Sequence, residues 1–145
     1  MQVLSVPYRI YINGIVFENT KINETSKPAI MKILVLDDDK DLCFLLRSFF
    51  EKKGCTVFTA NSLVDGLSII DKDEPTILFI DNFLPDGEGW KAAKTIKIKY
   101  PSLTINLMSA KDKSFNSLDE FEDIIWEKPI SVQQLETYLQ FLNKN

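Results

Sequence analysis

Five polar side chains in this 145-residue sequence have types and a spacing that suit phosphoryl chemistry. Asp37 and Asp38 follow the apolar run KILVL, Asp81 follows ILFI, Ser109 follows TINLM, and Lys128 comes shortly after IIW. A carboxylate can act as a nucleophile, while a hydroxyl and an ammonium can donate hydrogen bonds to phosphoryl oxygens. The set therefore implies a site at which a carboxylate takes up a phosphoryl group.

The three acids also imply a metal ion. If the strands before Asp37 and Asp81 are neighbours, the carboxylates of Asp37, Asp38 and Asp81 meet, and their repulsion raises at least one pKa. A hard divalent cation removes this repulsion. Because Mg²⁺ binds one or two carboxylates together with water and phosphate oxygens, the sequence predicts Mg²⁺ as the cofactor.

Several other chemistries are excluded by composition. The sequence contains no histidine, which rules out histidine-ligated zinc, Ser–His and Cys–His nucleophile pairs, and a histidine phosphodonor. The formal net charge of −4 argues against nucleic acid as the main partner. No apolar run approaches the roughly 20 residues that span a bilayer, and the N-terminus lacks a signal-peptide pattern. We therefore expect a cytoplasmic protein without a membrane segment.

Alternating strand and helix patterns position the polar residues. Short, mostly apolar runs predict buried strands over 32–36, 56–60, 77–80, 104–108 and 124–126, the fourth with a polar interruption at Asn106. Helical spacing predicts helices between them, with the first carrying the apolar stripe Leu42, Leu45, Leu46, Phe49 and Phe50. Ser131 and Gln134 form a capping-box pattern that begins the last helix. The alternation predicts an α/β fold with a parallel sheet covered on both sides, whose strand ends share one edge.

Two segments fit this alternation less well. The helix expected within 111–123 has sparse apolar residues, so it should be short or irregular. In residues 1–30, RIYINGIVFE places Asn-Gly between two strand-like runs, which predicts a hairpin. Two interpretations stay open: a genuine hairpin that packs on the domain, or a mis-assigned start with Met31 as the first residue. The predicted division is an extension over 1–30 and one domain over 31–145.

Four motifs, in this order, resemble the receiver domain of two-component response regulators. KILVLDDDKDL resembles the first strand with its acidic pair, and IDNFLPDGEGW resembles the phosphoacceptor strand with its proline and glycine four and eight residues later. LMSA resembles the hydroxyl-bearing strand end, and EKPI the lysine-proline pair. The resemblance covers roughly residues 31–143. It implies a flavodoxin-like, doubly wound five-stranded parallel sheet of order 2-1-3-4-5 with five helices.

The resemblance also implies a role for each residue. Asp81 would be the phosphoacceptor, and Ser109 and Lys128 would contact phosphoryl oxygens. Mg²⁺ would be held by Asp37, Asp38, Asp81 and the backbone carbonyl of Phe83. The phosphoryl group would come from a phosphohistidine of a histidine kinase or histidine phosphotransfer protein. The domain would catalyse only its own aspartyl phosphorylation and dephosphorylation, and would signal by contact with a downstream protein.

We expect a stand-alone receiver. Its expected oligomeric state is a monomer or a weak, phosphorylation-dependent dimer. Two departures from the family pattern qualify this expectation. Ile125 occupies the position that usually carries Tyr or Phe, and the segment from Ser109 to Lys128 is about three residues shorter than usual. These departures favour one alternative function, a pseudo-receiver that serves as a docking module without phosphorylation.

A second alternative is a haloacid-dehalogenase-like phosphatase. Asp37 and Asp39 fit its D-x-D spacing, although Asp41 occupies a place usually held by Thr or Val. Simpler interpretations exist for single residues: Asp38 or Asp39 could cap the first helix, and Lys128 could be a solvated surface lysine. The two cysteines, Cys43 and Cys55, are too far apart along one helix for a disulfide and are expected to be reduced.

Overall fold

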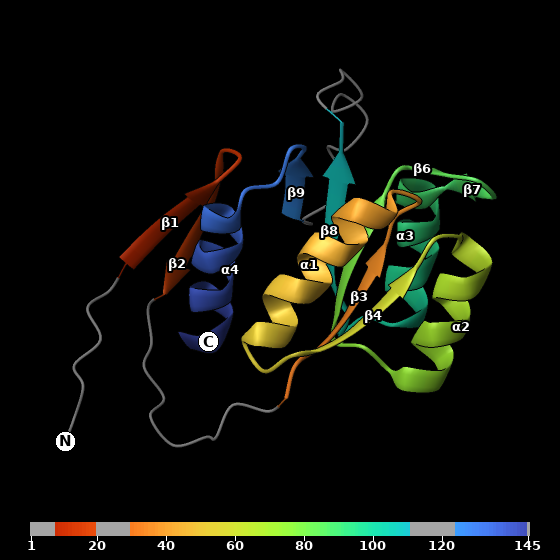
Figure 1. Cartoon of the computed structure of the whole chain (residues 1–145), viewed down its shortest axis with the longest axis horizontal. Helices are drawn as coiled ribbons and strands as arrows, with labels where there is room; N and C mark the ends of the chain where they lie inside the picture. Colours follow the sequence, from red (N-terminus) through yellow and green to blue (C-terminus); the bar gives the residue numbers. More distant parts are fainter. Residues whose placement is uncertain (1–7, 20–29, 111–123, 145) are drawn as a thin grey trace. The chain divides into compact units, whose positions relative to one another are not determined.

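A computed structural model describes residues 8–19, 30–110 and 124–144 of the chain. The chain divides into two compact units, one formed by Ile30–Lys128 and the other by Met1–Ala29 together with Pro129–Asn145. Figure 1 shows the elements of both units in sequence colours. Among the helices of the described residues, none is long and apolar enough to cross a membrane.

A five-stranded parallel sheet forms the centre of the larger unit. Its strands are β3 (Lys32–Leu36), β4 (Thr56–Ala60), β5 (Ile77–Asp81), β8 (Thr104–Ser109) and β9 (Ile124–Glu127). The spatial order is β4-β3-β5-β8-β9, and every neighbouring pair is parallel. Numbered along the chain, these five strands have the predicted order 2-1-3-4-5, so the predicted flavodoxin-like fold is confirmed.

The described residues contain four helices: α1 (Lys40–Lys52), α2 (Leu63–Asp73), α3 (Gly89–Lys99) and α4 (Val132–Lys144). The fifth predicted helix falls in 111–123, outside the described residues. A short antiparallel ladder of β6 (Phe83–Leu84) and β7 (Gly87–Glu88) follows β5. The sequence patterns did not predict this ladder, because two-residue strands carry no periodicity.

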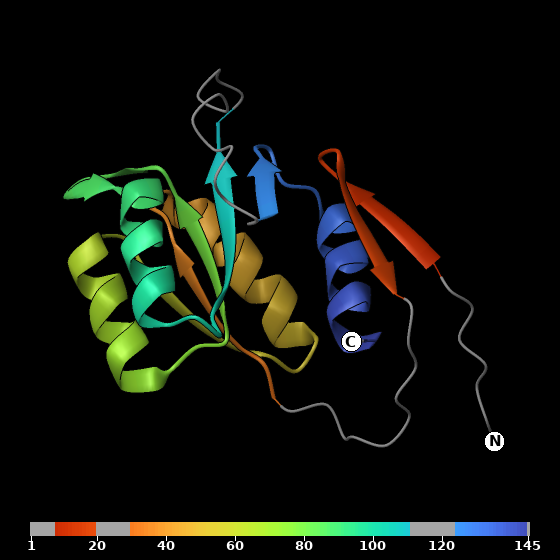
Figure 2. The same cartoon turned by 180° about the vertical axis from the view of Figure 1, so that it is seen from behind.

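Helices cover both faces of the sheet in the larger unit, with α2 and α3 on one side and α1 on the other (Figure 2). The side chains toward α2 and α3 form one buried cluster, which includes Leu34, Leu36, Leu78, Ile80, Ile105, Leu107, Ile70, Ala93 and Ile96. On the other face, Phe79 packs between Phe50 of α1 and Trp126 of β9, with ring centroids 5.7 and 5.6 Å away. Burial on both faces explains why the strands read as mostly apolar runs.

The inner face of α1 differs in part from the predicted stripe. Its buried residues are Cys43, Leu46, Phe49 and Phe50, whereas Leu45 is 39% exposed. Cys43 lies on the inner face, and its thiol donates to the carbonyl oxygen of Asp37 at 3.4 Å. The small side chain of Cys43 therefore lies near the start of α1 and contacts the residue that follows β3.

A buried polar pair links the last two strands of the sheet. The Trp126 indole N–H donates to Asn106 Oδ1 at 2.9 Å, and Asn106 Nδ2 donates to the carbonyl of Leu78 at 3.4 Å. Asn106 and Trp126 are both fully buried. Because unpaired buried polar groups are costly, the pair favours one register of β9 on β8.

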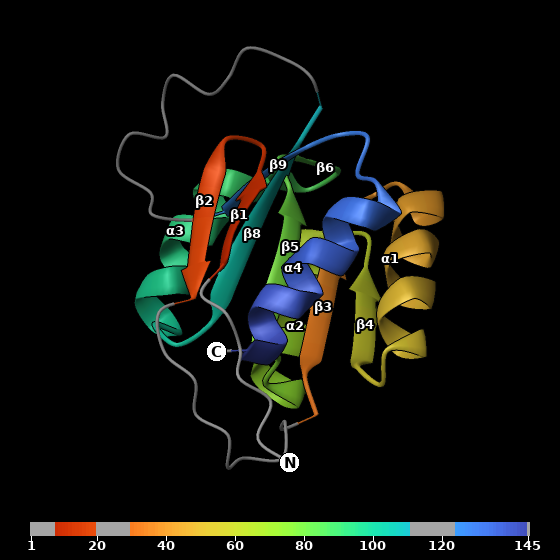
Figure 3. The same ribbon diagram turned by 90° about the vertical axis from the view of Figure 1, so that its left-hand side faces the viewer.

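The smaller unit contains the predicted hairpin. Strands β1 (Tyr8–Ile12) and β2 (Ile15–Asn19) pair antiparallel (Figure 3), and the turn residues Asn13 and Gly14 have φ of 49° and 79°. Positive φ at both turn positions is typical of the hairpin turn that Asn-Gly favours. Gln134 of α4 donates to Asn13 Oδ1 at 3.1 Å. The division of the sequence at residue 30 stays a prediction.

Candidate functional site

Three carboxylates converge at the carboxyl edge of the sheet. Asp37 and Asp38 directly follow β3, and Asp81 is the last residue of the neighbouring strand β5. One carboxylate oxygen from each of the three residues lies within 4.8 Å of the others. The structure therefore brings together the three acids that the sequence analysis selected.

Asp38 and Asp39 are adjacent in the chain, but their side chains have different roles. Asp39 is the N-cap, and its Oδ1 accepts from the amides of Asp41 at 3.0 Å and Leu42 at 3.2 Å. This pattern satisfies amides that have no partner within the helix. Because Asp39 takes the capping role, the carboxylate of Asp38 is left for the acidic cluster.

Asp37 is held by its backbone as well as by its side chain. Its amide donates to the carbonyl of Ala60 at 3.1 Å, its carbonyl accepts from Asn61 Nδ2 at 2.8 Å, and its Oδ1 accepts from the amide of Asp39 at 2.9 Å. Sequence reasoning missed Asn61. The available signal was its position directly after β4, a strand end at the same edge of the sheet.

Lys128 joins two of the acids. Its Nζ lies 2.7 Å from Asp37 Oδ2 and 3.0 Å from Asp81 Oδ1, and its amide donates to the carbonyl of Ser109 at 2.7 Å. The Lys128 side chain is 22% exposed, while those of Asp37 and Asp81 are 0% and 6% exposed. The interpretation of Lys128 as a solvated surface lysine is therefore wrong.

For both Asp37 and Lys128, burial and the ion pairs between them have opposing effects on the pKa, and the pKa of each residue is raised. Burial raises the pKa of Asp37, with the charge of Asp81 adding to the effect, although the hydrogen bond from Lys128 opposes it. Burial by itself would lower the pKa of Lys128, but its bonds to Asp37 and Asp81 outweigh burial and raise that pKa. Lys128 is therefore a cation that lies beside the closely spaced carboxylates of Asp37 and Asp81.

The loop after β5 holds Asp81 in place. The amide of Phe83 donates to Asp81 Oδ2 at 3.1 Å, and the amide of Gly89 donates to the carbonyl of Asn82 at 2.8 Å. A Cβ at Gly89 would lie 1.8 Å from the carbonyl oxygen of Asp81. Only glycine permits this close approach of the α3 start to the end of β5.

Ser109 lies at the same edge, on the strand next to β5, where Asp81 is opposite Met108. Its hydroxyl donates to the carbonyl of Ala110 at 2.6 Å. To donate to a group on Asp81, the hydroxyl must leave this bond. Ser109 therefore lies at the edge of the sheet that carries the acids, but its hydroxyl is bonded to Ala110.

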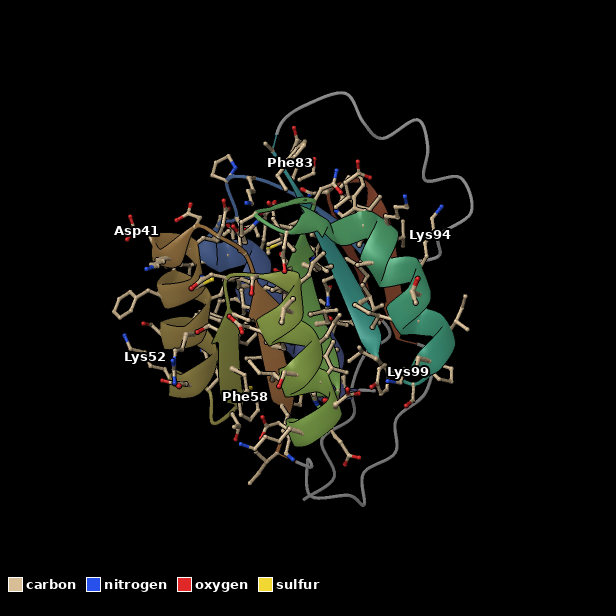
Figure 4. The ribbon with its side chains drawn as sticks, turned by 90° about the vertical axis from the view of Figure 1, so that its right-hand side faces the viewer. Asp41, Lys52, Phe58, Phe83, Lys94 and Lys99 are labelled. Carbon is tan, nitrogen blue, oxygen red and sulfur yellow. The ribbon has the colours of Figure 1, made fainter. Side chains whose placement is uncertain are left out.

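Phe83 contributes an exposed ring and a backbone carbonyl. Its side chain is 67% exposed, and Figure 4 shows it at the end of the unit opposite to Lys99. The predicted role of its carbonyl as a metal ligand stays a prediction. The carboxylates themselves fit Mg²⁺, because they supply closely spaced hard oxygen ligands.

The sheet order and this edge, with its acids, lysine and strand-end hydroxyl, define the receiver-domain class of fold. Residues 33–140 match the response regulator receiver domain family, and the chain belongs to this family.

Solved structures agree with this assignment. A two-component response regulator from Clostridium difficile is similar at 26% identity and a TM-score of 0.71, covering 79% of this chain and 97% of that chain. A CheY-like receiver domain from Methanospirillum hungatei JF-1 is similar at 24% identity and a TM-score of 0.71, covering 79% and 95%. The receiver domain of an HD domain-containing protein from Pseudomonas fluorescens Pf-5 has a TM-score of 0.72 at 22% identity, covering 84% and 93%.

Proposed function

We propose that Asp81 accepts a phosphoryl group from a phosphohistidine of a histidine kinase or histidine phosphotransfer protein, with Mg²⁺ as the cofactor. The observation that carries this proposal is the position of the Lys128 ammonium, 3.0 Å from Asp81 Oδ1. A fixed cation at the acceptor oxygen stabilises the charge that gathers on a phosphoryl group during transfer.

In the proposed step, a carboxylate oxygen of Asp81 forms a bond to phosphorus. The phosphorus–nitrogen bond to the partner's imidazole breaks, and its electron pair stays on that nitrogen. Lys128 donates to a phosphoryl oxygen, and the hydroxyl of Ser109 leaves Ala110 to donate to another. The product carries roughly −1.5 to −2 of added charge.

The metal would be held by the carboxylates of Asp37, Asp38 and Asp81 and by the carbonyl of Phe83. When bound, Mg²⁺ neutralises charge on the acidic cluster and on the phosphoryl oxygens. One observation supports this assignment: one carboxylate oxygen from each of the three acids lies within 4.8 Å of the others.

The output of the proposed reaction is a change in protein contacts. Movement of Ser109 toward the phosphoryl group would pull on the chain that follows β8, and a local shift of this kind can bias a two-state element. We propose that a downstream protein binds the altered surface, that the chain acts in the cytoplasm as a monomer or weak phosphorylation-dependent dimer, and that it performs no turnover beyond its own phosphorylation and dephosphorylation.

The test is intact mass spectrometry after incubation with acetyl phosphate and MgCl₂. We expect a mass gain of one phosphoryl group that is lost in Asp81→Asn and when EDTA replaces MgCl₂. Absence of a gain in the wild-type chain would favour the pseudo-receiver that only docks. Peptide mapping of the label to Asp37 in place of Asp81 would favour the phosphatase alternative.

A further inference from the structure

Asp86 connects the acceptor loop to a helix that begins 23 residues earlier in the chain. It lies in the turn between β6 and β7, and its carboxylate reaches the first turn of α2. Oδ1 accepts from the amide of Leu63 at 2.8 Å, and Oδ2 accepts from the amide of Val64 at 3.0 Å. The loop after β5 is thereby bonded to the helix after β4.

These two bonds complete the cap of α2. The first amides of a helix have no partner within it, and the positive end of the helix dipole attracts a carboxylate. The helix has its own N-cap, Ser62, but the Ser62 hydroxyl accepts only from Asp65, at 3.3 Å. Asp86 satisfies the two amides before Asp65, and their hydrogen bonds lower its pKa.

The opposite end of the β6–β7 ladder lies beside the acceptor. Phe83 is paired with Glu88, and Leu84 with Gly87, so Asp86 is at the tip of a small hairpin and Phe83 is at its base. The Phe83 amide donates to Asp81 Oδ2 at 3.1 Å. A short ladder therefore runs from the α2 cap to the carboxylate of Asp81.

A second contact fixes the tip of this hairpin on α2. Gly87 has a φ of +153°, and a Cβ built there would meet Leu63 Cδ1 at 2.9 Å. The backbone of the turn thus packs against Leu63, the residue whose amide Asp86 binds. Packing and hydrogen bonding hold the tip at one place.

We propose that Asp86 is a positioning residue, which holds the β6–β7 hairpin on α2 and so keeps the Phe83 amide and carbonyl in place beside Asp81. The part of this inference that concerns Mg²⁺ rests on the function proposed above. The mechanical part does not, because it concerns only how the hairpin is held.

The experiment compares Asp86→Ala and the near-isosteric Asp86→Asn with Ser62→Ala. Ser62→Ala removes a cap bond from the same helical turn without touching the hairpin, so it reports what helix destabilisation alone does. The first readout is amide hydrogen exchange without metal, at Leu63 and Val64 in α2 and at Phe83 and Gly89 in the acceptor loop. The second is Mg²⁺ affinity by calorimetry.

We expect both Asp86 variants to speed exchange in α2 and in the acceptor loop, and to weaken Mg²⁺ binding by about tenfold, as losses of outer-shell support do. Ser62→Ala should speed exchange in α2 only and leave Mg²⁺ affinity unchanged. Asp86 variants whose loop amides exchange as in wild type would overturn the proposal. A wild-type chain that binds no Mg²⁺ would refute the proposed function, while the exchange data would still decide the role of Asp86.

Discussion

Lys128 Nζ lies 2.7 Å from Asp37 Oδ2, although the two residues are 91 positions apart in the chain. The Asp37 side chain is fully buried, so the ammonium is the cation that compensates its charge from a strand at the far edge of the sheet. Removing one partner of a buried pair leaves an uncompensated charge, which is a large destabilisation. The pair therefore contributes to the fold as well as to the chemistry of the site.

Replacing Lys128 with glutamine should destabilise the metal-free protein by about 3 kcal/mol, because Asp37 loses its cation. MgCl₂ should restore part of this loss, since the metal would lie among the same carboxylates. Urea denaturation with and without MgCl₂ measures both effects. Lys99→Gln is the matched control: Lys99 forms an exposed pair with Asp71 and should contribute about 0–1 kcal/mol. Equal losses for the two variants would contradict the prediction.

Asp38→Asn should weaken Mg²⁺ binding by at least tenfold, the low end of the roughly 10–100-fold cost of losing even outer-shell support. Fold stability should change little, since Asp38 is exposed and its removal reduces repulsion in the cluster. Calorimetric titration with MgCl₂ measures the affinity. Asp41→Asn, an exposed acid in the first turn of α1, serves as the control. Similar affinities for Asp38→Asn and Asp41→Asn would remove Asp38 from the metal ligands.

Gly89→Ala should destabilise the fold by about 3 kcal/mol, because its Cβ would meet the carbonyl oxygen of Asp81 at 1.8 Å and force the backbone to move. The folded fraction should also lose the proposed phosphorylation, since the displaced backbone carbonyl belongs to Asp81. Thermal unfolding and intact mass measure the two effects. Gly54→Ala is the comparison: it has open space around its Cβ but a φ of +88°, and should cost only about 1–2 kcal/mol.

Phe83→Asn should shorten the lifetime of the proposed aspartyl phosphate, because the exposed side chain of Phe83, whose amide binds Asp81, would shield the acyl phosphate from water. Stability should change by no more than about 0.5 kcal/mol, as for other exposed positions. The decay of phosphorylated protein after removal of the phosphodonor, followed by intact mass, measures the lifetime. An unchanged half-life would eliminate the shielding role.

Burial raises the pKa of Cys43 to about 11, so folding favours the uncharged thiol. Its contribution to stability is therefore present below its ordinary pKa of 9.0 and is lost as the pH rises toward about 11. In Cys55→Ser, native Cys43 should react with a disulfide reagent at least about 100-fold more slowly than the same thiol in urea at pH 8. Comparable rates in the two states would show that the thiol is accessible and ionised.

The strands and the edge at which the acids lie could be predicted from local patterns, whereas the order that makes β3 and β5 neighbours was implied by the resemblance to the receiver family. Strands buried on both faces read as apolar runs, and parallel strands must deliver Asp37 and Asp81 to one edge. The hairpin could likewise be predicted, because Asn-Gly favours the positive φ angles of a tight hairpin turn. In each case a few adjacent residues carry the information.

The contacts that refine the site could not be predicted in this way. Asn61 binds the carbonyl of Asp37, and Asp86 caps a helix far away in sequence, because loops bring them there. Asn106 looked like a polar interruption of a strand, and only the position of Trp126 explains it. Rotamers and loop paths decide such contacts, and neither leaves a periodic signature.

The position of β9 as the last of the five strands along the chain has a consequence for biosynthesis. This strand is the last of the five to be translated, and the lysine that follows it completes the site. A nascent chain still missing this segment on the ribosome would present its acids without their cation. The proposed phosphorylation should therefore require synthesis of the chain through Lys128.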